Sequence, residues 1–346
     1  MQQLTIDTSA LTAPVTAADK QRYRAQNRTL ASRIITSLTV AALPLIVAAL
    51  LLGLFIAVLD GLPAAVVIGF IVVAAVLSVL AFFATLSGGT RHIQMRKFAE
   101  SNGFVFHRHE PPERLRGVLF DTGNSRNNHT VVQMHGNVRL GNYQYTTGSG
   151  KSRTTHHWRY IEVPLPRNMP NLVLDSTDNN GIFGTNLPVR LQRSQRIELE
   201  GDFNRHFTLY APQGYDVDVR YILPPDTMAL LIDNLSTFDL EFIDDRLMIV
   251  AAGTWDMHDD KPWRFAEWVV NMLHPHIVDR THRYVDDRAG LATMTAPGPQ
   301  HTGNGASSSG RGTVSSSGKR LKRGFPIVSV VFFIVIAAIV FLPRLL

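Results

Sequence analysis

The sequence predicts an α+β domain, built mainly on an antiparallel sheet and attached to transmembrane helices. The helices are an N-terminal two-helix hairpin plus one C-terminal helix. Three observations predict this arrangement. Uncharged apolar runs occupy residues 34–59, 62–86 and 325–342. Residues 91–290 alternate many short strand-like segments with a few helical ones, an order typical of α+β domains. Basic residues gather where the apolar runs end, as they do at the cytoplasmic ends of membrane spans.

The apolar runs have the length that a membrane span needs. A bilayer core is about 30 Å thick and a helix rises about 1.5 Å per residue, so roughly 20 residues cross it. Residues 34–59 and 62–86 exceed this length, and residues 325–342 are near the lower limit. Only Asp60 and Gly61 separate the first two runs, which predicts a membrane hairpin. A signal peptide is disfavoured because the first apolar run is too long and follows a polar segment.

The basic residues predict the orientation of the chain. Because Lys and Arg concentrate on the cytoplasmic side, all three flanks point to the cytosol. We expect a multi-pass plasma membrane protein whose main domain is cytosolic. Residues beside a span also attract anionic lipids of the inner leaflet, by about 1 kcal/mol each. The flanking residues are Lys20, Arg22, Arg24, Arg28 and Arg33 before the first run, Arg91, Arg96 and Lys97 after the second, and Lys319, Arg320, Lys322 and Arg323 before the third.

Composition divides the chain into five parts. Residues 1–33 are polar and are predicted to be a disordered cytosolic N-terminus. The transmembrane hairpin covers residues 34–86 and the cytosolic α+β domain residues 91–290. Residues 291–324 are rich in Gly, Ser and Thr and predict a flexible linker with a basic end, a coil that spans roughly 30 Å. The last part is the helix of residues 325–342.

The first half of the domain is predicted to be mostly strands. A short helix precedes them and ends at Gly103, a residue that commonly follows a helix C-terminus. Many short strand-like segments follow, with Gly136 and Gly141 as a turn or bulges, and this order favours a mainly antiparallel α+β domain. The predicted strands are "GFVFHRH", "GVLFD", "TVVQMHGNVRLGNYQYTT", "HHWRYIEVPLP", "NLVLDS", "RSQRIELEGDF" and "RHFTLYAP".

The second half alternates helix and sheet. "PPDTMALLIDNL", residues 224–235, places proline at the start of a short amphipathic helix, where proline is favoured. "FDLEFIDDRLMIVAA" predicts a β-hairpin with Asp244 and Asp245 in its turn. Residues 262–287 have apolar side chains at helical spacing and predict a last helix, kinked at Pro275.

"TTGSGKSRTT" resembles the end of a phosphate-binding loop. That loop requires G-x-x-x-x-G-K-[ST], with a strand before it and a helix after it. The first glycine would be residue 145, but Tyr145 stands there, and strand-forming residues follow Ser152. The stretch therefore predicts a solvated hairpin loop between two strands.

Thirteen histidines and no cysteine restrict the metal chemistry that is open to the chain. His107 and His109 lie two residues apart on one face of a predicted strand, so they are weak candidates for zinc ligands with Glu110 and either His129 or His135. The alternative is a set of exposed or hydrogen-bonded imidazoles. Since no H-E-x-x-H or other strong spacing occurs, we expect no cofactor, and no pattern indicates nucleic-acid binding.

Three stretches carry a family resemblance. They are "GNYQYTTGSGKSRTTHHWRYIEVPLPRNMPNLVLDS", "NNGIFGTNLP" and "LEGDFNRHFTLYAPQGYDVDVRYILPPDTMALLID". Together they resemble uncharacterised bacterial, mostly actinobacterial, integral membrane proteins with an N-terminal span hairpin and a cytosolic domain of unknown function. The resemblance covers roughly residues 90–275. It implies membrane location and a shared fold, and it implies no activity.

The sequence thus predicts a non-enzymatic, membrane-anchored interaction or scaffold module. Its cytosolic domain would bind a protein partner or the lipids of the anionic inner leaflet. Two alternatives stay open: a metal-dependent hydrolase that uses His107 and His109, and an oligomeric transporter or channel subunit. The apolar runs contain no ionisable residue, which disfavours a pump. Homo-oligomerisation is compatible with any of the three.

Overall fold

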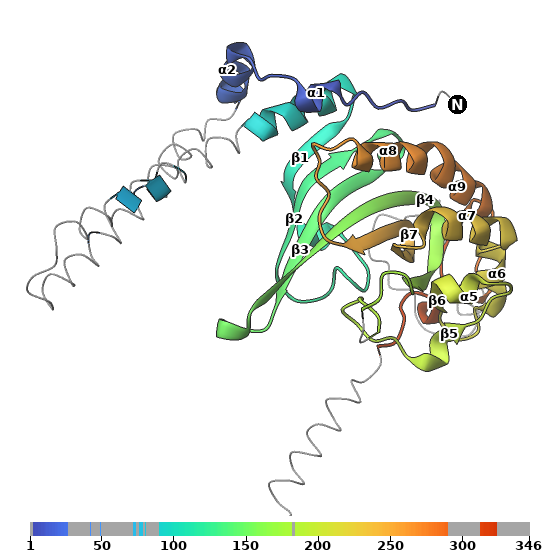
Figure 1. The fold of residues 1–346 in the computed structure, drawn as a ribbon. Helices are drawn as coiled ribbons and strands as arrows, with labels where there is room; N and C mark the ends of the chain where they lie inside the picture. The colour runs from blue at the N-terminus through green and yellow to red at the C-terminus, as the bar shows by residue number, and fades with distance from the viewer. Residues whose placement is uncertain are drawn as a thin grey trace, which may run out of the picture. The chain divides into compact units, whose positions relative to one another are not determined.

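The computed structural model describes residues 3–26, 42, 49, 72–73, 76–78, 80, 90–181, 184–289 and 312–323 (Figure 1). The predicted spans 34–59 and 62–86 lie outside the described residues except at a few positions, and 325–342 lies wholly outside. None of the helices within the described ranges combines the length and apolar character needed to cross a membrane. The chain forms two compact units. Unit 1 contains Met1–Thr5, Phe104–Asp256 and Lys261–Leu346, and unit 2 contains Ile6–Gly103 and Met257–Asp260.

Unit 1 is built on a seven-stranded sheet whose pairings are all antiparallel. One path through the sheet runs β1-β2-β3-β4-β6-β5, and β7 pairs with β4. With the helices described below, this confirms an α+β domain with a mainly antiparallel sheet. The strands are β1 (Val105–Glu110), β2 (Asn124–Gln133), β3 (Arg139–Thr147), β4 (Thr154–Ser176), β5 (Arg196–Ile197), β6 (Phe207–Tyr210) and β7 (Asp239–Ala252).

The long strand β4 organises the sheet (Figure 1). Its first half pairs with β3 as far as Glu162, and its end pairs with β6 from Val173. Along its other edge β4 pairs with β7. The sequence predicted two separate strands where β4 is continuous, because prolines commonly end strands. Pro164, Pro166 and Pro170 lie between the β3 and β6 pairings, where one edge of β4 has no ladder partner and a missing N–H is tolerated.

The hairpin predicted at Asp244 and Asp245 is wrong, because β7 continues through both residues as a single strand. Asp244 has a φ of 51°, and the pairing of β4 with β7 shifts register around Met169 and Asp244. Such an irregularity bends a strand without ending it. The residues that were expected to reverse the chain therefore bend it.

Helices accompany one side of the bent sheet. Figure 1 shows α8 and α9 lying along it, and α9 packs on β4. The helix predicted at residues 224–235 is confirmed as α7, with proline in its first turn. The last predicted helix forms α8 and α9, and a π-helical turn that ends at Leu273, two residues before Pro275, joins them. The helices are α5 (Phe203–His206), α6 (Asp216–Ile222), α7 (Pro225–Leu235), α8 (Lys261–Trp268), η5 (Val269–Leu273) and α9 (His274–Thr281).

A buried cluster of largely aromatic side chains covers the face of the sheet that carries Tyr143 and Tyr160. The ring of Phe120 meets both tyrosines edge-on, with centroid distances of 4.9 and 5.8 Å. Phe120 belongs to residues 112–121, which we call the lid segment. It begins with η1 (Pro112–Arg114) and then forms turns where the sequence predicted the strand "GVLFD". This segment serves as a lid over the sheet, because it buries Leu115, Leu119 and Phe120.

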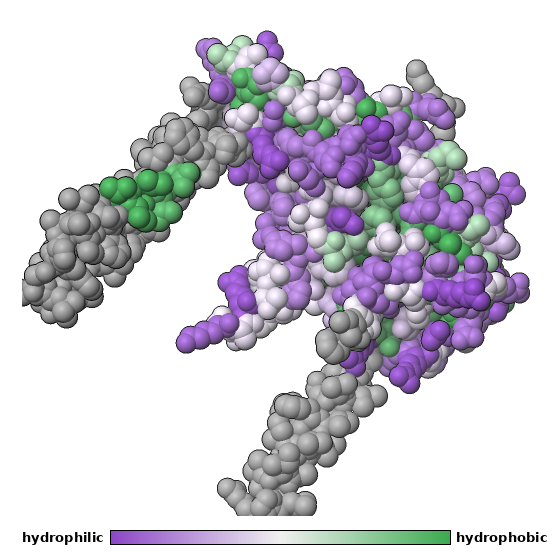
Figure 2. Space-filling view, in the orientation of Figure 1, coloured by the Kyte–Doolittle hydropathy of each residue, from purple (hydrophilic) through white to green (hydrophobic). Residues whose placement is uncertain are grey.

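Short 3-10 turns complete unit 1. The turn η3 (Gly150–Ser152) joins β3 to β4, so the predicted hairpin loop at "TTGSGKSRTT" is confirmed. The others are η2 (His135–Asn137), η4 (Arg193–Gln195) and η6 (Ser316–Gly318). The surface of unit 1 in view in Figure 2 is mostly hydrophilic, with small hydrophobic patches.

Unit 2 contains helical segments on both sides of the first two apolar runs. These are α1 (Ser9–Thr12), α2 (Ala17–Gln26) and a helix over residues 90–101. The predicted helix end is confirmed, since Gly103 follows with a φ of 67°. The prediction of disorder over residues 1–33 is wrong for the part with α1 and α2, which hydrogen-bonds to the 90–101 helix through Gln94 and Lys97.

Candidate functional site

The most informative site involves residues 312–323, which we call the strap. The sequence predicted a flexible linker there, but the structure packs the strap against the rest of unit 1. Val314 and Leu321 are buried, and Leu321 joins a small apolar cluster with Val173 and Leu187. The flexible-linker prediction is therefore wrong for the strap, while residues 291–311 lie outside the described ranges.

Side-chain amides of the sheet region hold the end of the strap. Gln195 Oε1 accepts a hydrogen bond from the Lys322 N–H at 2.8 Å, and its Nε2 donates to the Lys322 carbonyl at 2.8 Å. Asn171 Oδ1 accepts from the Leu321 N–H at 3.0 Å. Each amide thus satisfies strap backbone groups that would otherwise need water or a strand partner.

A second anchor holds the start of the strap. The Ser315 N–H donates to Asp286 Oδ2 at 2.8 Å, and the Tyr215 hydroxyl donates to the same oxygen at 2.7 Å. Burial acts to raise the pKa of Asp286, but these hydrogen bonds, together with those from the backbone and side chain of Arg288, outweigh it and lower the pKa overall. Gly318 lies against the Tyr215 ring so closely that a Cβ atom would overlap the hydroxyl.

Asn171 also connects the strap to a buried carboxyl group. Its Nδ2 donates to Glu241 Oε1 at 2.8 Å, while the Val118 N–H donates to Glu241 Oε2 at 2.8 Å. Burial raises the pKa of Glu241 to about 7, although both hydrogen bonds oppose the rise. Strap, sheet and lid segment therefore share one hydrogen-bond network.

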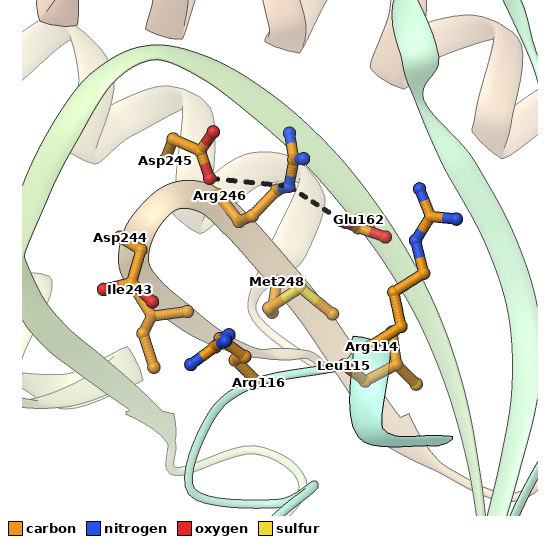
Figure 3. A pocket seen from close by; sticks show the side chains of 9 residues that line it. All are labelled: Arg114, Leu115, Arg116, Glu162, Ile243, Asp244, Asp245, Arg246 and Met248. Atoms are coloured by element: carbon orange, nitrogen blue, oxygen red, sulfur yellow. Dashed lines mark ion pairs between the residues drawn. The ribbon is translucent and has the colours of Figure 1, made fainter. Parts of the chain in front are cut away.

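Two adjoining pockets lie beside the strap, and together we call them the hollow. The first, shown in Figure 3, has a volume of about 140 Å³ and lies between the lid segment and β7. The second has a volume of about 470 Å³ and is partly walled by Lys319 and Arg320 of the strap. Arg116 and Asp244 line both pockets. Figure 3 shows Arg114 and Arg116 on the lid segment, with Arg246, Asp244 and Asp245 on β7.

The hollow carries more positive than negative charge. Five basic side chains and three carboxylates line its two pockets. Arg320 pairs with Asp244, and Arg246 pairs with Glu162 at 2.8 Å and with Asp245 at 3.7 Å. The other three, Arg114, Arg116 and Lys319, are exposed and form no ion pair with a carboxylate in the described part of the chain. The arrangement suits an anion.

A buried ionic network lies behind the hollow. Arg139 Nη2 is 2.6 Å from Glu110 Oε1, and Arg139 Nη1 is 4.0 Å from Glu162 Oε2. Burial raises the pKa of Glu162, against the opposing charges of Arg246 and Arg139. Tyr160 donates from the same face to Asn128 Oδ1 at 2.9 Å. These groups link four strands, and Glu162 is the member that reaches the hollow.

The histidine candidates do not assemble into a metal centre. His109 lies directly opposite His129 across β1 and β2, with ring centroids 6.5 Å apart. His107 lies 3.5 Å from Glu110, whose carboxylate also binds Arg139. His135 instead meets Phe104 edge-on. Within the residues that the structure describes, no three His, Asp or Glu side chains are placed to share a metal ion.

The predicted lipid-facing basic residues have different surroundings. Lys97 pairs with Asp19 at 2.9 Å in unit 2, and Arg96 lies over the Tyr23 ring, 5.8 Å from its centroid. The Arg91 carbonyl accepts from His258 Nε2 at 3.1 Å. In the strap, Arg320 binds Asp244, whereas Lys319, Lys322 and Arg323 are exposed. Arg114 and Arg116 were missed because they lie far from any apolar run. Their only sequence signal is the "ERLR" spacing on either side of a buried leucine.

Comparison with known proteins adds nothing to this geometry: no protein-family model, curated protein or solved structure matches the chain. The strap and the hollow are therefore interpreted from their own chemistry.

Proposed function

We propose that the chain is a multi-pass plasma membrane protein whose cytosolic α+β domain acts as a non-enzymatic, membrane-anchored interaction module. The observation that carries this proposal is the contact between the two outer flanks of the first two apolar runs. In unit 2, Lys97 Nζ lies 2.9 Å from Asp19 Oδ2, and Gln94 Nε2 donates to the Ala13 carbonyl at 3.0 Å. A helical hairpin returns the chain to the side from which it came, so its flanks meet in this way.

The described residues of the second apolar run support a lipid environment. They are helical, and their large side chains are exposed in the isolated chain. Exposed apolar groups in succession mark a surface that is covered by lipid or protein. The exposed fractions are 55% for Val72, 58% for Val73, 52% for Val76, 51% for Leu77 and 60% for Leu80.

The strap gives the anchored domain a fixed C-terminal attachment. Its last residue, Arg323, bridges to Leu191, and the third apolar run begins at Phe325. A freely moving linker would let the domain diffuse tens of ångströms from the bilayer. A docked strap instead keeps unit 1 beside the third predicted span. We place an interaction role above hydrolase or transporter roles because the strap and hollow suit binding, and no described feature favours either alternative.

Topology labelling tests the proposal. The chain has no cysteine, so Ser149→Cys in the exposed η3 loop introduces a single thiol. We expect a membrane-impermeant maleimide to label it only after the cells are permeabilised. Arg344→Cys, beyond the third apolar run, is the matched control and should be labelled in intact cells. Labelling of Ser149→Cys in intact cells would contradict the cytosolic location, and release of the chain by alkaline carbonate would contradict membrane integration.

A further inference from the structure

The hollow has the features of a site for one particular class of anion. Arg114 and Arg116 flank Leu115, whose side chain is buried under the lid segment. The 3-10 turn fixes the local backbone, since the Leu115 N–H donates to the Pro112 carbonyl at 3.1 Å. Both arginines line the same pocket. The fixed backbone therefore places both long side chains at this pocket, with the guanidinium group of Arg114 on the side of Glu162 and that of Arg116 on the side of Asp244 (Figure 3).

Their chemistry favours phosphate. A guanidinium group presents N–H donors in a planar fork that matches two oxygens of a phosphate, and such charge-assisted pairs are among the stronger hydrogen bonds in proteins. Lys319 adds an ammonium group from the strap side. The carboxylates of the hollow leave an excess of positive charge, because Asp244 is engaged by Arg320, and Glu162 and Asp245 by Arg246, although the charge of Arg114 also acts on Glu162.

The position of the hollow indicates the source of the phosphate, and this step rests on the proposed membrane anchoring. Lys319 and Arg320 wall the hollow, and the third apolar run starts five residues after Arg320. Each residue extends at most about 3.6 Å, so this wall lies within about 18 Å of the start of the run. The headgroup layer of a bilayer crossed by residues 325–342 lies in the same range. Met169 and Val314, both buried, line the hollow beside the cations.

We propose that the hollow binds the phosphate of an anionic phospholipid headgroup, with Arg114 and Arg116 as the principal ligands and Lys319 as a third contact. The strap then forms part of a lipid-binding site as well as an attachment.

The test uses the full chain purified in a neutral detergent and native mass spectrometry to count bound lipid. Short-chain phosphatidylglycerol, short-chain phosphatidylcholine and inorganic phosphate are titrated separately. The test variant is Arg114→Gln with Arg116→Gln, and the matched control is Arg153→Gln with Arg205→Gln, two arginines that are also exposed. We expect phosphatidylglycerol affinity to fall at least tenfold in the test variant and to change less than twofold in the control.

Other results overturn the proposal in distinguishable ways. If both double variants bind phosphatidylglycerol with equal affinity, the hollow is not the lipid-binding site. Equal affinity for the two lipids would contradict the preference for an anionic headgroup, and inorganic phosphate binding as tightly as phosphatidylglycerol would show a site for the free ion. Carbonate extraction of the same variants separates this inference from the proposed function. If the chain stays in the membrane but binds lipid independently of Arg114 and Arg116, the proposed lipid-binding site is wrong and the proposed membrane anchoring stands.

Discussion

Arg320 and Asp244 form a bidentate pair, with Nη1–Oδ1 and Nη2–Oδ2 distances that are both 3.0 Å. Asp244 has a left-handed backbone at the irregularity of β7, with a φ of 51°. Asp and Asn adopt this conformation more readily than most residues. The bend that redirects the strand thus also presents a carboxylate to the strap. The hydrogen bonds with Asp244 raise the pKa of Arg320, in keeping with a fully charged pair.

Asp244→Asn should loosen the strap without disturbing β7, because asparagine tolerates the same backbone conformation. Both partners are partly exposed, so the pair contributes only about 0.2–1 kcal/mol. We expect trypsin to cut at Lys319, Arg320 and Lys322 a few times faster than in the wild-type chain, as measured by mass spectrometry of timed digests. Glu198→Gln, in the exposed pair with Arg196, serves as the control. Equal cleavage in all three chains would show that the pair does not hold the strap.

Gly318→Ala should displace the strap near its first anchor. The added methyl group would overlap the Tyr215 hydroxyl and crowd Val314, and overpacking costs about 1–3 kcal/mol. We expect a lower thermal midpoint for the full chain in detergent, followed by tryptophan fluorescence. Gly181→Ala is the control, because a Cβ there meets open space. A midpoint unchanged from the wild type would contradict the packing of Gly318 on Tyr215.

Arg139→Met should be among the more destabilising substitutions. The side chain of Arg139 is only 3% exposed, and its removal leaves the buried Glu110 carboxylate without its closest cation. Breaking one partner of a buried pair costs about 3–5 kcal/mol. We expect a denaturant midpoint well below that of Arg246→Met, since Arg246 is 33% exposed. Adding Glu110→Gln to Arg139→Met should recover some of the loss. If it recovers none, the loss comes from packing and not from the uncompensated charge.

Stability should fall as the pH rises toward neutrality. Leu174 pairs with Leu240, so Asp175 and Asp239 lie side by side on neighbouring strands. Burial raises the pKa of Asp175 to about 6 and that of Asp239 to about 7, from a usual 3.8. The folded chain therefore holds protons that the unfolded chain releases. The stability they contribute is complete below about pH 4 and is lost as the pH rises through 6 to 7.

Asp175→Asn tests this linkage. Asparagine keeps an acceptor for the Thr185 hydroxyl, which donates to Asp175 Oδ1 at 2.8 Å. The pKa of Asp175 is raised by about two units and one unit corresponds to about 1.36 kcal/mol, so the free energy of unfolding of the variant should exceed that of the wild type by about 3 kcal/mol at pH 8 and by almost nothing at pH 4. Urea unfolding of the full chain between pH 4 and pH 8 measures how steeply the free energy of unfolding changes with pH. The exposed Asp202→Asn should leave it unchanged, and a wild-type slope in Asp175→Asn would disprove the assignment.

Sequence patterns predicted the elements whose signals lie within a few consecutive residues. The proline-started helix α7, the helix end at Gly103 and the hairpin loop at Lys151 all depend on local chemistry of this kind. The long strands were harder to predict. Proline and paired aspartates usually end strands, and only the pairing of β4 with three different partners explains why they do not do so here.

The strap was beyond prediction for a different reason. Its composition is that of a linker, and its attachment depends on side chains distant in sequence. Leu321 meets Asn171 across 150 residues, and Lys322 meets Gln195 across 127. A stretch of Gly, Ser and Lys carries no sequence signal for a hydrogen-bond partner elsewhere in the chain. The hollow could not be predicted either, because one of its walls belongs to the strap and the other to the lid segment.

The order of attachments along the strap has a mechanical consequence. Arg323, which bridges to Leu191, is the attached residue nearest the third apolar run, followed inward by Lys322, Leu321, Arg320 and Ser315. A pull on the chain from that run loads the Arg323 bridge first and the Gln195 contact second, and the remaining contacts then separate one after another. Each step breaks only a few hydrogen bonds, so the rupture force of any single step is low. Under a lateral pull the C-terminal tether would peel away while the sheet, with its many simultaneous pairings, keeps its shape.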